Sequence, residues 1–147
     1  MSHSTPPVYN NSNVTATGEP PLDQPYVGAP LPVVFKRFFK KYATFSGRAS
    51  RSEFWWYELV AVVVGVVYLG LSTALAHSSA LVAVEVIYYI WAAATLIPSL
   101  ALSWRRLHDT NRAGGWYFIG LIPIVGGILF LVWMAGESKP AGARFDR

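Results

Sequence analysis

The chain has 147 residues and no cysteine, and 53% of its residues are hydrophobic whereas only 14% are charged. Soluble domains contain about 25% charged residues, and their cores need polar positions interleaved at helical or strand spacing. Here the charges, with a formal net value of +4, gather in short segments between long apolar blocks. The composition argues strongly against a water-soluble enzyme or a disulfide-stapled secreted domain, and predicts a small integral membrane protein.

Residues 1–30 predict a disordered tail. They hold most of the ten prolines, contain no lysine or arginine, and are otherwise rich in Ser, Thr, Asn and Gly. Such a segment cannot bury enough apolar surface to offset the entropy that it loses on ordering. We therefore expect a membrane domain over residues 31–136, followed by a polar C-terminal tail over residues 137–147.

Residues 31–45 predict an amphipathic helix that is too short and too charged to cross a bilayer. Its apolar and aromatic side chains recur at spacings of three and four. The opposite face carries four cations, which are Lys36, Arg37, Lys40 and Lys41. Such a helix lies in the plane of the lipid head groups, with its aromatic face toward the bilayer and its cations toward the anionic surface. The alternative is a helix that packs on a neighbouring soluble protein.

Three apolar segments, over residues 54–76, 80–104 and 116–136, each have the length of a membrane span. A hydrocarbon core of about 30 Å needs about 20 residues of helix. Ser50 and Glu53 have the spacing of a capping box, which marks the start of the first span. The predicted fold class is thus all-α, with an N-terminal interfacial helix followed by three transmembrane helices.

The distribution of lysine and arginine predicts the orientation, because cytoplasmic loops carry these residues in excess. The segment before the first span and the loop at 105–115 are basic, whereas the turn at 77–79 has no basic residue. This places the N-terminus in the cytoplasm, and three crossings then place the C-terminus outside. Pro123 and Gly126-Gly127 interrupt the third segment. A re-entrant hairpin that returns the tail to the cytoplasm is therefore the alternative.

Two charged clusters, one before the first span and one between the second and third, are predicted to meet at the cytoplasmic interface. Arginine suits such a site because its planar guanidinium binds carboxylate or phosphate through two parallel hydrogen bonds. The candidate ligands of an anion or lipid head group are Arg48, Arg51, Arg105, Arg106 and Arg112. Their candidate structural or ion-pair partners are Glu53, Glu58, His108 and Asp109. The alternative is that these arginines only determine topology.

Two acidic residues lie inside the predicted spans. Glu58 is one turn inside the first span, where a carboxylate is costly unless paired, and we expect an arginine of the 105–115 loop to be its partner. Glu85 lies in the second span, and a proton-coupled step with His77 is conceivable. Because the spans offer few further members for a proton relay, we favour a hydrogen-bonded Glu85 at a contact between helices.

No catalytic or metal site is predicted. A metal site needs several histidines and carboxylates that converge, and the chain has three histidines in separate regions. Ser103 is the only serine close in sequence to His108 that could serve as a nucleophile, and no glycine-rich phosphate loop is present. We therefore expect no cofactor, no metal and no nucleic-acid partner.

Four motifs stand out: GRASRSEFWW before the first span, RRLHDTNRAGGW before the last, LIPIVG within it, and ARF in the C-terminal tail. Together they resemble the DUF805 family, a group of small bacterial inner-membrane proteins of uncharacterised function. The resemblance covers about residues 35–146. It implies a bacterial inner-membrane location and a helical fold, but no activity. The tail departs from the family pattern, because Ala143 and Asp146 stand where that pattern has asparagine and glycine.

The sequence thus predicts a multi-pass protein of the bacterial inner (plasma) membrane. Its expected function is that of a non-enzymatic module whose arginine-rich cytoplasmic face binds anionic membrane lipids or an acidic partner protein. One alternative is a subunit of a small transporter or channel, which would require a homo-oligomer. A membrane enzyme that acts on a lipid-linked phosphate through His108 and Asp109 is a third possibility.

Overall fold

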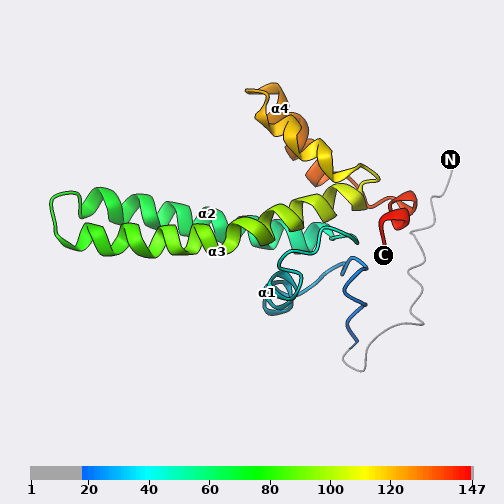
Figure 1. Ribbon diagram of the computed structural model, residues 1–147, viewed down its shortest axis with the longest axis horizontal. Helices are drawn as coiled ribbons and strands as arrows, with labels where there is room; N and C mark the ends of the chain where they lie inside the picture. The colour runs from blue at the N-terminus through cyan, green and yellow to red at the C-terminus, as the bar shows by residue number, and fades with distance from the viewer. Residues whose placement is uncertain (1–17, 147) are drawn as a thin grey trace.

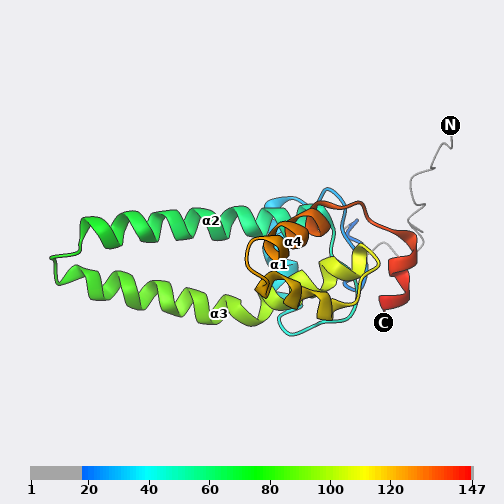
Figure 2. The same cartoon turned by 90° about the horizontal axis from the view of Figure 1, so that it is seen from above.

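The computed structural model describes residues 18–146, and within this range every element is helical. The elements are α1 (Leu31–Lys40), α2 (Arg51–Ala74), α3 (Ala80–Asp109), η2 (Gly114–Leu121), α4 (Val125–Ala135) and η3 (Pro140–Phe145). Helices α2 and α3 form a long antiparallel hairpin, and the other elements gather at its open end (Figures 1 and 2). We call this end, formed by residues 18–53, 105–116 and 134–146, the head.

The start of α2 confirms the predicted capping box. The hydroxyl of Ser50 accepts a hydrogen bond from the backbone N–H of Glu53 at 3.2 Å, and the Glu53 carboxylate accepts one from the backbone N–H of Ser50 at 2.9 Å. These two bonds satisfy donors that a helix leaves free at its N-terminus. The first span therefore begins where the sequence indicates.

Helices α2 and α3 are the two helices within residues 18–146 that are long and apolar enough to cross a membrane. Their outer faces expose large apolar side chains, such as Val66 at 64% and Ile87 at 68%. Water would oppose such exposure, whereas lipid tails solvate it. The second predicted span, 80–104, lies within α3, and the first, 54–76, runs two residues beyond the end of α2.

The prediction of a third continuous spanning helix over residues 116–136 is wrong. This segment folds into the 3-10 helix η2 and the 11-residue helix α4, joined by a reversal at Pro123 and Ile124. The backbone of Ile124 has a positive φ of 65°, which is rare for a β-branched residue. At about 1.5 Å per residue, α4 covers about half of the thickness of a hydrocarbon core. The segment leaves the head and returns to it (Figure 1).

Within the described residues, the C-terminal tail does not lie at the far end of the α2–α3 hairpin, where a third crossing would place it. Residues 137–146 lie in the head beside the residues that precede α2 (Figure 1). The backbone N–H of Lys139 donates to the carbonyl of Asp109 at 2.8 Å, and that of Gly47 donates to the carbonyl of Phe145 at 2.8 Å. A third crossing would have carried the tail to the far end of the α2–α3 hairpin, out of reach of these partners.

Helix α1 is present but shorter than predicted, and one part of its predicted cationic face is wrong. Arg37 and Lys41 are each only 2% exposed, and Arg37 pairs with Glu53 at the start of α2. Residues 18–30 also depart from the prediction of disorder: the carbonyls of Pro20 and Gln24 accept hydrogen bonds from Arg37 at 2.9 and 2.7 Å. The remaining residues of that predicted tail, 1–17, lie outside the described residues.

The close approach of α4 to η2 depends on one glycine. A Cβ added at Gly126 would lie 1.9 Å from the carbonyl oxygen of Ile119, whereas one added at the adjacent Gly127 would meet no atom within 4 Å. We expect Gly126→Ala to lower the free energy of unfolding by about 1–3 kcal/mol, the usual cost of overpacking. Gly127→Ala is the matched control, and thermal unfolding of both variants in detergent, followed by tryptophan fluorescence, checks the difference. Equal stability of the two variants would contradict the tight contact.

Candidate functional site

The head is organised around two buried carboxylates. The first, Glu53 at the start of α2, is 4% exposed. One of its oxygens accepts from the guanidinium Nε of Arg37 at 2.8 Å, and the other accepts from the backbone N–H groups of Ser50 and Tyr26 at 2.9 and 3.0 Å. A buried ion pair is retained when its remaining hydrogen-bonding capacity is met in this way. Glu53 thereby joins α1, α2 and the N-terminal segment.

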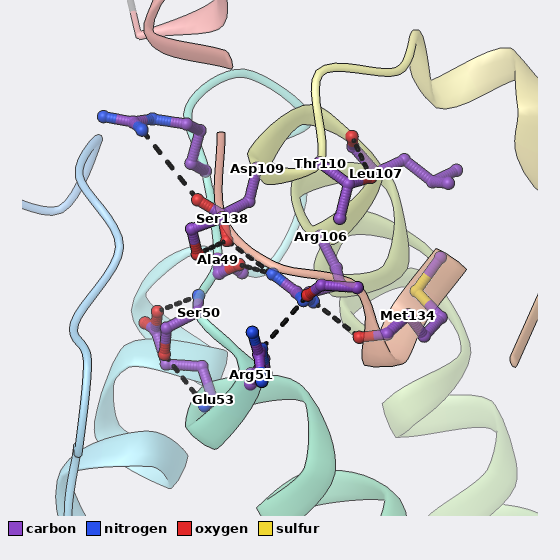
Figure 3. Close-up of polar contacts among 12 residues, drawn as sticks. Ala49, Ser50, Arg51, Glu53, Arg106, Leu107, Asp109, Thr110, Met134 and Ser138 are labelled. Carbon is purple, nitrogen blue, oxygen red and sulfur yellow. Dashed lines mark hydrogen bonds and ion pairs between the residues drawn. The ribbon is translucent and has the colours of Figure 1, made fainter. Parts of the chain in front are cut away.

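The second carboxylate is Asp109, the last residue of α3, which is fully buried. One of its oxygens accepts from the guanidinium of Arg106 and from the hydroxyl of Ser138, as Figure 3 shows. Its other oxygen lies 3.9 Å from a guanidinium nitrogen of Arg48. Three segments that are distant in sequence therefore converge on one side chain.

Arg106 extends this network to the end of α4 (Figure 3). Its side chain has no solvent exposure and donates from Nε to the carbonyl of Met134 at 2.9 Å. Its other nitrogens donate to the carbonyls of Gly136 and Ala49. Helix C-termini leave carbonyls without intrahelical partners, so a buried guanidinium is well suited to cap the C-terminus of α4.

The C-terminal tail is held by two further contacts. Arg48 donates to both carboxylate oxygens of Asp146, with nitrogen–oxygen distances of 2.7 to 3.1 Å. The ring of His108 stacks on Phe145 at 4.0 Å between centroids, and its Nδ1 lies 3.0 Å from the carbonyl oxygen of Gly47. Asp146, one of the residues that departs from the family pattern, therefore has a definite partner here.

Two of the five candidate arginines remain directed outward. Arg51 is exposed and donates from Nε to the carbonyl of Gly136 at 3.1 Å. Arg112 is partly exposed, and its guanidinium lies 4.7 Å from the centre of the Trp133 ring. Both side chains thus contact the C-terminal end of α4. Arg105, by contrast, is buried and donates to the carbonyl of Ala101 on its own helix at 3.0 Å.

The predicted partner of Glu58 is wrong, whereas the interpretation of Glu85 agrees with the structure. No ion pair of Glu58 is found within residues 18–146, because the guanidinium groups of Arg105 and Arg106 turn into the head. Glu85 accepts from the hydroxyl of Tyr68 on the neighbouring helix at 3.0 and 3.2 Å. It is therefore a hydrogen-bonded acid at a contact between α2 and α3.

Three members of the head were not predicted from the sequence, namely Arg37, Lys41 and Ser138. A signal was present for the first two, because helical spacing places Lys41 on the face of Val34 and Phe38, and Arg37 adjoins it. For Ser138 no local pattern was available, since it lies 29 residues from its partner Asp109. No cluster of metal-ligating side chains is present in the part of the chain that the structure describes.

The fold and these clusters define a small helical membrane protein whose long hairpin is anchored in a head of buried ion pairs. The model of the DUF805 family, described as a protein of unknown function, matches residues 42–147, and the chain belongs to this family. Inner membrane protein YhaI of Escherichia coli (strain K12) is 36% identical over 110 residues, which cover 72% of this chain and 86% of YhaI. Inner membrane protein YhaH of the same strain is 31% identical over 111 residues, which cover 76% and 91% of the two chains. No solved structure matches the chain.

The Arg37–Glu53 pair provides a direct test of the head. Glu53→Gln keeps the size of the side chain but leaves Arg37 as a buried charge without its carboxylate, so we expect a loss of about 3–5 kcal/mol in the free energy of unfolding. Glu137→Gln removes the same charge from an exposed position and serves as the control. Thermal unfolding in detergent checks both variants, and a Glu53→Gln protein as stable as the control would rule out this role.

Proposed function

We propose that this protein is a non-enzymatic membrane module whose head rests on the cytoplasmic face of the inner membrane and binds anionic lipid head groups. One observation carries the proposal: Arg51 is an exposed cation one helical turn from the exposed Trp55. Residues four apart lie on the same face of a helix. Tryptophan at the interface and arginine one turn further out match the depths of the glycerol region and the lipid phosphate.

The burial of the other arginines narrows the predicted binding face. Arg105 and Arg106 are buried, and Arg48 holds Asp146, so the guanidinium groups of these three act within the head. Arg51 and Arg112 face outward beside the end of α4. We therefore assign lipid binding to these two residues and an internal structural role to the other three.

We further propose that α2 and α3 cross the membrane and that the η2–α4 segment enters it only part-way. The tips of this segment are apolar on all sides, with Leu121 at 77% and Ile124 at 80% exposure. All 12 lysines and arginines lie outside residues 54–104. With two crossings and a re-entrant segment, every one of them is on the same side, as the distribution of cytoplasmic charge favours. Both ends of the described chain are then cytoplasmic.

The absence of cysteine makes this topology directly testable, because each variant then carries a single thiol. We expect Ser79→Cys, in the turn between α2 and α3, to react with a membrane-impermeant maleimide in intact spheroplasts. Glu137→Cys, just after α4, is expected to react only after the membrane is made permeable. Reaction of Glu137→Cys in intact spheroplasts would show that the last segment crosses the membrane.

Lipid binding is tested by native mass spectrometry of the protein in phosphatidylglycerol-containing detergent micelles. An arginine near an anionic surface contributes about 1 kcal/mol, so we expect Arg51→Gln to weaken phosphatidylglycerol binding by about fivefold. Lys139→Gln makes the same charge change at an exposed position in the C-terminal tail and serves as the control. Equal lipid retention by both variants would contradict the assignment of Arg51.

The second candidate function is that of a subunit in an oligomeric transporter or channel. The broken η2–α4 segment favours it, since interrupted helices line binding sites in several transporter folds. Two crossing helices do not enclose a pore, so this function requires several copies of the chain. A monomer in lipid nanodiscs, established by mass photometry, would eliminate this candidate and leave the lipid-binding module unaffected.

A further inference from the structure

A cavity of about 390 Å³ lies beside the C-terminal end of α1. None of the residues that line it takes part in the proposed lipid binding. Its walls come from the segment before α1, the last turn of α1 and the loop that leads to α2. The lining residues are Leu22, Asp23, Lys40, Lys41, Thr44 and Ser46. The lining residues thus include two lysines, one aspartate and two residues with hydroxyl groups, around a space large enough for a small polar ligand.

Lys41 is the unusual member of this lining. It is 2% exposed, and within residues 18–146 its Nζ has no hydrogen-bond partner. An unsatisfied buried donor costs about 1–3 kcal/mol, and more when it is charged. The Glu53 carboxylate acts on Lys41 electrostatically but accepts its hydrogen bonds from Arg37 and two backbone N–H groups instead of from Lys41. The amine is thus a donor that the protein itself leaves unused.

The charges around Lys41 favour an anion. The groups that act on it are Glu53 of α2, Arg105 of α3, Arg37 of α1 and Asp23 of the N-terminal segment. Burial, opposed by the two carboxylates and reinforced by the two guanidinium groups, lowers the pKa of Lys41 to about 7. A bound anion would favour the charged amine and supply the missing acceptor.

We propose that this cavity binds a phosphate group that still carries a proton, held by the amines of Lys40 and Lys41. Asp23 determines this choice of anion. A carboxylate only accepts hydrogen bonds, so it repels a fully deprotonated oxyanion such as sulfate but accepts the O–H of a monoprotonated phosphate. The hydroxyl groups of Thr44 and Ser46 can donate to the remaining oxygens.

Two sources could supply this chemistry. One is inorganic phosphate from the cytoplasm, and the other is the phosphomonoester head group of phosphatidic acid in the adjacent leaflet. Lipids whose phosphate is a diester have no such proton and are not expected to bind here. The phosphate site uses residues other than Arg51 and Arg112. The phosphate proposal can therefore fail while the lipid-binding proposal holds, and the reverse is equally possible.

The test is isothermal titration calorimetry of the full-length protein in phosphatidylcholine nanodiscs at neutral pH, with inorganic phosphate and with sulfate. We expect phosphate to bind and sulfate to bind about tenfold more weakly or not at all, the difference of one hydrogen bond to a charged group. Lys41→Met is expected to lose phosphate binding by about tenfold or more on the same grounds. Lys139→Met, an exposed lysine outside the cavity, is the control.

Asp23→Asn probes the selectivity independently of affinity. An amide can donate as well as accept, so this variant is expected to bind sulfate and phosphate with similar strength. Thr44→Val, at an exposed position on the rim, gives a second measure of phosphate affinity that does not depend on replacing a buried lysine. We expect it to weaken phosphate binding.

A second set of nanodiscs that contain phosphatidic acid distinguishes the two sources. If the head group occupies the cavity, phosphatidic acid will exclude inorganic phosphate, and the heat of phosphate binding to the unaltered protein will disappear in these nanodiscs. The heat measured for Lys41→Met will then be the same in both sets of nanodiscs. If free phosphate is the ligand, the heat persists in both sets. The proposal is overturned if neither form of phosphate binds the unaltered protein, if Lys41→Met and Thr44→Val both bind it with unchanged affinity, or if sulfate binds the unaltered protein as well as phosphate does.

Discussion

The course of the last third of the chain depends on the buried guanidinium of Arg106. It pairs with Asp109 on its own helix and donates to two backbone carbonyls of other segments, at Ala49 before α2 and at Met134 in the last turn of α4. Removing a charged group from water is costly unless each of its donors is satisfied, and the partners of Arg106 come from three separate segments. The end of α4 must therefore return to the head, because a helix that crossed the membrane at this point would deprive the guanidinium of the Met134 and Gly136 carbonyls.

Basic side chains are absent from the two long apolar segments and are concentrated in the head. No lysine or arginine lies within residues 54–104, and the two long helices present apolar side chains to their surroundings. In the head, by contrast, Glu53 and Asp109 draw basic side chains inward and tie the N-terminal segment, α1 and the C-terminal tail to the ends of α2 and α3. Most of the arginine-rich motif thus stabilises the fold. The outward-facing arginines, with Lys40 and the unpaired Lys41, are the cations that we assign to contacts with other molecules.

The local parts of the fold could be predicted because their signals lie within a few residues. The Ser50–Glu53 capping box, the apolar lengths of α2 and α3, and the family motifs around Arg105 are all of this kind. The head could not be predicted, because its bonds join residues such as Arg48 and Asp146, 98 positions apart. A cation near the end of a helix has the same appearance in the sequence whether it faces lipid phosphate or a buried carboxylate.

The sequence by itself determined that this is a helical membrane protein of the DUF805 family, where its two long helices lie, and at which end of those helices its positive charge gathers. Those properties follow from hydrophobic length and charge, which are sums over neighbouring residues. Only the tertiary structure decided that the third apolar segment turns back at Pro123, that Arg37 and Arg106 are internal, and that Lys41 borders a cavity. The reason is that a buried charge takes its position from partners brought together by folding, and these partners have no fixed spacing in the chain.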